Sequence, residues 1–143
     1  DPDKKMLELN TFEDKVLGTA ENLPFEDNSF DNVFCCFVWR NVSDTNKALQ
    51  EVYRVLRPGG KFILLDMTRP KNPFLKILHK IGTFKVLHLI GLLTFNLKEY
   101  RFLYKSLDFY PQPENHLKKD TFIDLQIERM GLFNFVYLAV FTK

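Results

Sequence analysis

The sequence has few residues that could form disulfides or bind metals. Only two cysteines occur, Cys35 and Cys36, and they are adjacent in an apolar run, where strand side chains point to opposite faces. A disulfide between them is not expected, and a reducing compartment is favoured. The three histidines, His79, His88 and His116, lie far apart and have no cysteine or carboxylate partner at metal-ligand spacing, so no metal site is predicted.

Charge of one sign and long apolar runs are also scarce. The formal net charge of +2 is too small to indicate nucleic-acid binding. The most apolar segment, Val86–Phe95, has about half of the ~20 residues that a transmembrane helix needs. The chain is therefore not expected to span a membrane, while contact with a membrane surface stays open. No signal peptide or transit sequence is recognisable from Asp1.

Phenylalanine, by contrast, is abundant, with 15 copies among 143 residues. This length is typical of one domain or a large piece of one, and it suffices to bury a sizeable core. The phenylalanines indicate either a thick core or an apolar surface that meets another apolar body, and composition leaves both open.

One stretch carries a strand–helix–strand pattern. Phe30–Trp39 is an almost unbroken apolar run, which predicts a strand covered on both faces. Ser43 is the predicted N-cap of a helix whose apolar residues recur at spacings of three and four, and Pro58-Gly59-Gly60 is predicted to end it. Lys61–Met67 follows as a second covered strand. The pattern predicts a βαβ unit in a parallel sheet.

The rest of the chain is divided by turn residues and by changes in apolar period. These signals predict further elements of each kind. They are a helix that starts within Asp1–Leu9 and breaks off early, a short strand at Lys15–Thr19, a loop at Asn22–Ser29, helices within Thr68–Leu97, a helix at Tyr100–Phe109, a helix at Asp120–Met130 and a strand at Leu132–Phe141.

Polar residues that follow buried strands are the candidate site residues, because open parallel sheets bind ligands at the carboxyl ends of their strands. Arg40 and Asn41 directly follow the first strand, where a guanidinium can clamp an anion or a developing phenolate oxygen. The alternative is that Arg40 is a surface residue and Asn41 a turn former. Thr19 could offer a hydroxyl to a ligand amine, and Asp66 a carboxylate.

Two other conspicuous segments have simpler interpretations. Arg57–Gly60 lies at a predicted helix end, where carbonyl groups face outward, so it cannot cradle phosphate and is interpreted as structural. Phe74–Phe95, which is dotted with lysine and histidine, could be a lid over a hydrophobic substrate, a membrane-surface contact or core helices.

Several segments together resemble a known family. They are ENLPFEDNSFDNV, the Arg40-Asn41-Val42 that follows an apolar strand, KALQEVYRVLRPGGKFILLD, FKVLHLIG and EYRFLYKSLDFYPQPE. The chain resembles the ubiquinone/menaquinone biosynthesis C-methyltransferases, which are class I methyltransferases that use S-adenosylmethionine. The resemblance implies an α/β fold, the Rossmann-like three-layer sandwich, and C-methylation of a polyprenylated benzoquinol or demethylmenaquinol.

The resemblance also implies roles for individual residues. Asp1 resembles the acid that holds the cofactor ribose, and Thr19 and Ala20 resemble the adenine-contacting pair. Phe37, Arg40 and Asn41 fall where the family places the methyl group and the quinol, which makes Arg40 and Asn41 the candidate catalytic residues. Tyr100 and Arg101 lie in the substrate-cap region.

The sequence departs from the family in several respects. No glycine-rich turn for the methionine part of the cofactor is present, and Thr19 stands where the family usually has Asp or Asn. The helix and connection expected between Leu7 and Lys15 are cut short, and so is the region between Gly131 and Val136. Residues 1–143 are therefore interpreted as a partial methyltransferase domain, incomplete at the N-terminus, with 68–110 as a helical substrate-cap or membrane-facing insertion. Two rival functions stay open. One is a catalytically incomplete subunit that binds a prenyl lipid or a partner protein, and the other is a methyltransferase for another small molecule.

Location and partners follow from the resemblance alone. It implies the matrix side of the mitochondrial inner membrane if the source is eukaryotic, and the cytoplasm or the membrane periphery if it is bacterial. The expected partner is a prenylated quinol substrate, with no nucleic acid. Peripheral membrane contact, a homo-oligomer and a complex of quinone-biosynthesis enzymes are all compatible with it.

Overall fold

The computed structural model describes residues 1–118 and 121–143, and its chain divides into two units. Unit 1 contains Asp1–Leu64, the described part of Lys119–Leu125, and Val140–Lys143. Unit 2 contains Leu65–Lys118 and Gln126–Ala139.

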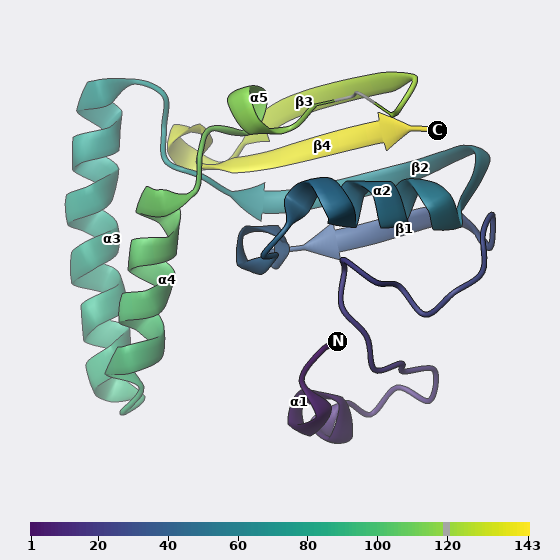
Figure 1. Cartoon of the computed structure of the whole chain (residues 1–143). Helices are drawn as coiled ribbons and strands as arrows, with labels where there is room; N and C mark the ends of the chain where they lie inside the picture. The colour runs from purple at the N-terminus through teal and green to yellow at the C-terminus, as the bar shows by residue number, and fades with distance from the viewer. Residues whose placement is uncertain (119–120) are drawn as a thin grey trace. The chain divides into compact units, whose positions relative to one another are not determined.

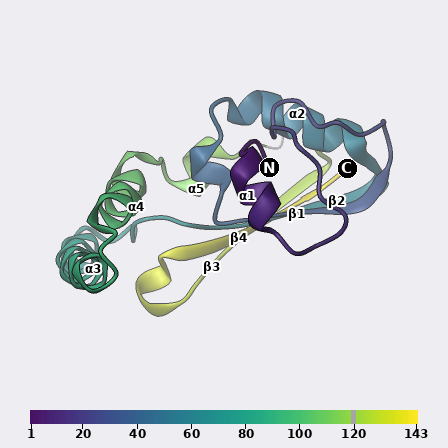
Figure 2. The ribbon, with the colours of Figure 1, turned by 90° about the horizontal axis from the view of Figure 1, so that it is seen from below.

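The predicted βαβ unit is present. It consists of β1 (Phe30–Cys36), α2 (Thr45–Val55) and β2 (Leu56–Met67). Strands β1 and β2 are neighbours in the sheet and point the same way (Figure 1), so this part of the sheet is parallel as predicted. Figure 2 shows α2 lying along one face of these two strands. The buried face of α2 carries Ala48, Leu49, Val52 and Val55, which are the residues of the periodic pattern.

The N-cap of α2 is Asp44, so the prediction of Ser43 is wrong by one residue. The Asp44 carboxylate accepts a hydrogen bond from the Lys47 N–H at 3.0 Å. Serine and aspartate are both good N-cap residues, and the residue whose side chain accepts a hydrogen bond from the first turn of the helix is the N-cap. Ser43 instead donates its own N–H to Glu21.

Pro58-Gly59-Gly60 does not end the helix, because α2 stops at Val55 and β2 already begins at Leu56. The segment is the first part of a strand that pairs with the chain's last residue: Gly59 N–H donates to the Lys143 carbonyl, and Lys143 N–H donates to the Gly60 carbonyl. Gly59 has a φ of +80°, and a Cβ on Gly60 would lie 2.8 Å from two carbonyl oxygens. The glycines are therefore required by strand geometry and close backbone approach.

The four strands follow the order β1-β2-β4-β3, with β3 at Asp124–Met130 and β4 at Val136–Thr142. Backbone hydrogen bonds join Gly59 with Lys143 and Thr68 with Phe135. From Gly59 to Thr68 the residue number rises, while the number of the hydrogen-bonded partner falls from Lys143 to Phe135. The strands β2 and β4 therefore run antiparallel. The predicted α/β class is confirmed, with a mixed sheet in place of an all-parallel one.

The predicted strand at Phe30–Trp39 is too long, and its burial on both faces is wrong for the described residues. β1 ends at Cys36, most of its residues are exposed, and the Phe34 side chain is 69% exposed. β1 lies at one end of the strand order, where a strand has a single described neighbour. Trp39 belongs to a short 3-10 helix, η1 (Trp39–Asn41), and is only 1% exposed.

Three further predictions need correction. The predicted helix at Asp120–Met130 is wrong, because residues 124–130 form β3, and its predicted start at Asp120 lies outside the described residues. Here Leu125 and Ile127 alternate with polar residues, the period of a strand. The strand predicted from Leu132 begins at Val136, after the 3-10 helix η2 (Leu132–Asn134). Lys15–Thr19 forms no strand, only one bridge between Thr19 and Asn22. The early helix is confirmed as α1 (Lys4–Leu9).

The core of unit 1 is an aromatic cluster around Phe62. The Phe62 ring lies 5.5 Å from both Trp39 and Phe141, and the Phe141 ring lies 5.0 Å from Phe122. Phe62 and Phe141 are completely buried. Some of the abundant phenylalanine therefore forms a core, at about 1.5–3 kcal/mol for each fully buried side chain.

Unit 2 carries a pair of long helices, α3 (Pro73–Leu93) and α4 (Leu97–Phe109), followed by the short α5 (Pro113–His116). Asn72 caps α3 through hydrogen bonds to its side chain from the N–H groups of Phe74 and Leu75. The two helices lie side by side (Figures 1 and 2) and confirm the helices expected in residues 68–110. Within residues 1–118 and 121–143, no helix combines the length and apolarity that a membrane crossing requires.

Candidate functional site

In unit 1, Glu21 joins the two segments that carry most of the predicted site residues. Its carboxylate accepts the N–H groups of Ser43 at 2.9 Å and Asp44 at 3.2 Å. Burial acts to raise the pKa of Glu21, but the Asp44 and Ser43 N–H groups and the Thr19 side chain outweigh it, and the pKa lies below its usual value. The loop with Thr19 is thus tethered to the chain that directly follows Arg40 and Asn41.

Asp1 lies against the same loop. Its carbonyl accepts the Gly18 N–H at 3.2 Å, and its N-terminal amine donates to the Val16 carbonyl at 3.1 Å. The Asp1 carboxylate accepts the Asp3 N–H at 2.8 Å and is exposed. The structure therefore brings Asp1 next to the segment of Thr19 and Ala20.

The segment after β1 has an unusual backbone. Phe37 has a φ of +59°, which is strained for a residue with a side chain, and its ring is 42% exposed. This conformation turns the chain from β1 into η1, which contains Arg40 and Asn41. Arg40 is half-buried and Asn41 is exposed. A positive φ also occurs at Asn28, Phe95, Phe133 and Asn134, so the roles of Phe37, Arg40 and Asn41 stay predictions.

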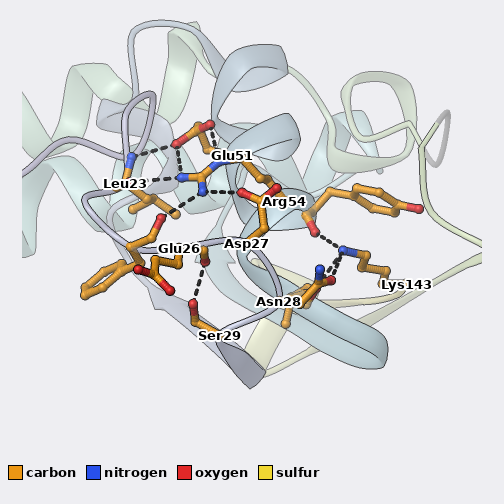
Figure 3. Close-up of polar contacts among 11 residues, drawn as sticks. Leu23, Glu26, Asp27, Asn28, Ser29, Glu51, Arg54 and Lys143 are labelled. Carbon is orange, nitrogen blue, oxygen red and sulfur yellow. Dashed lines mark hydrogen bonds and ion pairs between the residues drawn. The ribbon is translucent and has the colours of Figure 1, made fainter.

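A second tether holds the far end of the same loop against α2 (Figure 3). Glu51 accepts the Leu23 N–H at 2.8 Å and pairs with Arg54, whose guanidinium also contacts Asp27 at 2.8 Å and the Leu23 and Phe25 carbonyls. The Arg54 hydrogen bonds are the main cause that lowers the pKa of Glu51 to about 2. The loop between Thr19 and Ser29 is therefore anchored at both ends.

Tyr100 and Arg101, the predicted substrate-cap residues, belong to unit 2. They lie on α4 and line a small cavity of about 150 Å³ together with Phe84 and His88 of α3. The structure assigns them to a different unit from Asp1, Thr19, Ala20, Phe37, Arg40 and Asn41. Their predicted role stays a prediction.

Unit 2 also contains a buried arginine that sequence analysis did not single out. Arg69 is 1% exposed, and its guanidinium contacts Asp108 at 2.9 Å, His79 Nδ1 at 3.2 Å and Thr83 Oγ1 at 2.8 Å. It also lies over the Tyr104 ring, 4.9 Å from its centroid. Such a charge is tolerated in the interior only because it is paired and hydrogen-bonded on several sides.

An apolar groove of about 540 Å³ lies beside this network, within the size range of small-molecule sites. His79 and Thr83 are the lining residues with polar side chains, and the other lining residues are apolar. The lining comprises Met67, Leu78, His79, Gly82, Thr83, Val86, Leu87, Leu103, Leu107, Leu132, Phe133 and Phe135.

The sequence contains one local signal for the buried network. His79 and Thr83 are separated by four positions, which places them on one face of a helix. Arg69 and Asp108 are distant in sequence, so their pairing could not be predicted. Within the described part of the chain, no three His, Cys, Asp or Glu side chains are grouped as a metal site would require.

Comparisons with known proteins agree with this architecture. A family model described as the ubiE/COQ5 methyltransferase family matches residues 4–137. The ubiquinone/menaquinone biosynthesis C-methyltransferase UbiE of Rickettsia bellii is 43% identical over 114 residues, which is 78% of this chain and 46% of the relative. That of Rickettsia prowazekii is 40% identical over 115 residues, with the same shares. The chain thus spans about half the length of the curated relatives it matches.

Solved structures support the fold. A putative methyltransferase from an antibiotic biosynthesis pathway of Anabaena variabilis aligns with a TM-score of 0.62 at 22% identity, covering 91% of this chain and 47% of the other. A SAM-dependent methyltransferase of Thermotoga maritima, described as a possible histamine N-methyltransferase, aligns with a TM-score of 0.59 at 22% identity, covering 90% and 63%. The fold is therefore the Rossmann-like fold of class I methyltransferases.

Proposed function

This chain belongs to the ubiE/COQ5 methyltransferase family, and from this premise we propose that it is the part of an S-adenosylmethionine-dependent enzyme that methylates a ring carbon of a prenylated quinol in ubiquinone or menaquinone biosynthesis. One observation carries the proposal: Glu21 ties the loop of Thr19 to the segment after Arg40 and Asn41. The residues assigned to the cofactor and to the reacting ring are thereby held in one unit.

The residues of unit 1 fit the nucleoside of S-adenosylmethionine. The Gly18 N–H donates to the Asp1 carbonyl, which supports assigning the ribose to Asp1 and the adenine to the neighbouring pair Thr19 and Ala20. Ribose and adenine are directly bonded, so their binding residues need to be neighbours. The cofactor would supply an electrophilic methyl group, and Phe37, which is exposed, is the residue proposed to lie against it.

Arg40 has the chemical properties needed at the acceptor ring. A quinol ring becomes a carbon nucleophile as negative charge develops on its oxygen, and a fixed guanidinium stabilises that charge. Asn41 can orient the same oxygen through its amide N–H groups. Holding the ring carbon in line with the methyl group supplies the rest of the acceleration. No residue is assigned as the base that accepts the ring proton.

The experiment measures transfer of a labelled methyl group to a demethylated, short-tailed polyprenyl benzoquinol, with isothermal titration of S-adenosylmethionine alongside. Arg40→Ala should lower turnover about 10²-fold without changing the unfolding midpoint. The matched control is Arg57→Ala, which removes a surface ion pair with Asp31 and should leave turnover unchanged. Unchanged turnover in Arg40→Ala would remove Arg40 from the site.

Product analysis separates the proposal from its rivals. Methylation at a ring carbon of the quinol supports it, whereas methylation only of other small molecules would favour a different acceptor. Absence of S-adenosylmethionine binding would favour a non-catalytic subunit.

Location at a membrane surface is a further part of the proposal. Helix α3 carries three lysines and no acidic residue, and Phe74, Ile77 and Ile81 form an exposed apolar stripe, with 73, 60 and 51% exposure. Basic helices with an apolar stripe bind anionic lipid surfaces. Sedimentation with anionic liposomes should deplete the protein from the supernatant, and full recovery in the supernatant would contradict this.

A further inference from the structure

The apolar groove of unit 2 exposes one polar group that has no partner. Thr83 Oγ1 accepts from Arg69 and donates to the carbonyl of His79 or Lys80, so its only O–H donor is used. His79 Nδ1 is occupied by Arg69, but among the described residues nothing pairs with His79 Nε2. His79 is 7% exposed and lines the groove. Among the described residues, Nε2 is not one of the fully buried side-chain atoms without a partner, so this ring nitrogen is open to a ligand in the groove.

The contact with Arg69 determines which ring nitrogen of His79 carries the proton. A guanidinium can only donate, so Nδ1 must present its lone pair to Arg69 NH1. The proton of the neutral ring then resides on Nε2. Burial and the neighbouring positive charge of Arg69 also lower the pKa of His79, which keeps the ring neutral. His79 is therefore a hydrogen-bond donor with a fixed orientation.

The position of the ring is supported from two sides. His79 stacks on Phe135 with ring centroids 5.0 Å apart, and Arg69 is itself held by Asp108 and by the Tyr104 carbonyl. A donor that is held this firmly loses little entropy on binding a ligand. The structure therefore combines an apolar groove with a single preorganised donor in its wall.

We propose that His79 is a specificity-determining residue of a ligand site in this groove, where its Nε2–H donates a hydrogen bond to an oxygen of an otherwise apolar ligand. The class of ligand is a hydrophobic ring or chain with one hydrogen-bond-accepting oxygen, such as a phenol or quinol with a prenyl substituent. The choice of a prenylated quinol within that class rests on the proposed function. A purely hydrocarbon ligand would leave the donor buried without a partner, which costs binding free energy.

The test compares two probes that differ by one oxygen, 2-geranylphenol and geranylbenzene, by fluorescence or calorimetric titration of the full chain. The wild type should bind the phenol about tenfold more tightly. His79→Phe removes the donor and should bind both probes equally. His79→Gln places an amide N–H near Nε2 and should retain part of the preference. Lys85→Gln is the control, since Lys85 is exposed on the same helix and lines neither this groove nor the small cavity of Tyr100 and Arg101.

A measurement on the wild type tests the same proposal without the variants, and it therefore applies even if they do not fold. In ¹⁵N-labelled protein at neutral pH, the His79 ring should show the Nε2–H tautomer, and its Nε2 signal should shift with 2-geranylphenol but not with geranylbenzene. Equal affinity of the two probes in the wild type, or an Nδ1–H tautomer, would overturn the inference. Phenol selectivity without methyl transfer would uphold the inference while refuting the proposed function, and methyl transfer without phenol selectivity would do the reverse.

Discussion

Replacing Glu51 with glutamine tests whether the anchor between α2 and the loop of Thr19–Ser29 is electrostatic. The change keeps the shape of the side chain and removes its charge. Glu51 receives hydrogen bonds from Leu23 N–H and from two guanidinium nitrogens of Arg54 (Figure 3). A glutamine oxygen can accept some of these bonds, but its NH₂ group faces donors. The loop should therefore be held less firmly.

The size of the effect follows from the pKa of Glu51, which Arg54 in particular lowers from 4.5 to about 2. At about 1.4 kcal/mol per pKa unit, the full shift corresponds to about 3 kcal/mol. Arg54 is 31% exposed, and screening by solvent reduces the expected loss of unfolding free energy to about 2 kcal/mol. Because the folded pKa lies below the unfolded one, this stabilisation is complete above pH 4.5 and disappears as the pH falls toward 2.

Urea unfolding followed by circular dichroism at pH 7 and at pH 2.5 measures this difference. Glu51→Gln should cost about 2 kcal/mol at pH 7 and much less at pH 2.5. At that pH the carboxyl is protonated in the unfolded chain, and ionisation in the folded chain, where the pKa is about 2, keeps only a small part of the stabilisation. Hydrogen exchange at the Leu23 amide should accelerate in the variant at pH 7. Glu26→Gln, an exposed change in the same loop, should cost less than about 0.5 kcal/mol. An equal cost of Glu51→Gln at both pH values would refute the reasoning.

Three further predictions concern the interior. Burial and Arg69 lower the pKa of His79, so the unfolded chain binds a proton at this ring more readily than the folded chain, and the unfolding free energy should fall as the pH drops below about 6.5. Fluorescence-detected unfolding at pH 7.5 and 5.5 should show a smaller fall in His79→Gln than in the wild type. An equal fall in both proteins would contradict this prediction. Arg69→Met removes the charged hydrogen bonds of the buried guanidinium, while Asp108 keeps its ion pair with Lys80, and the change should cost about 2 kcal/mol in urea unfolding. An unchanged unfolding free energy would show that the network is not stabilising. Phe62→Ala removes the centre of the unit 1 core and should cost about 3–5 kcal/mol, which thermal unfolding would reveal as a large fall in midpoint; an unchanged midpoint would refute it.

Local patterns in the sequence were sufficient for some elements, and they named candidates for the site. The apolar period of three and four predicts α2, the apolar run before it predicts β1, and the apolar run at Lys61–Met67 predicts the later part of β2. These signals arise within a few residues of one another, because a helix makes its hydrogen bonds locally. Arg40 and Asn41 follow the same logic, since the end of a predicted strand marks the ligand edge of a parallel sheet.

The remaining features depend on residues that are distant in the chain. Gly59 and Gly60 are typical of residues that end a helix. In the structure they instead form backbone hydrogen bonds with Lys143 and belong to a strand. A strand's hydrogen bonds lie with its neighbours in space, so its own residues cannot reveal which segment they will pair with.

The same reason separates the two ligand-binding proposals. The loop of Thr19 and the segment of Arg40 carry recognisable motifs, so the sequence alone determined them as candidates. Only tertiary structure brought Arg69 to His79 and Asp108 to Arg69, determined the tautomer of the His79 ring and placed His79 in the wall of an apolar groove. That donor exists because three segments fold against one another, and the sequence of each segment read alone contains no sign of it.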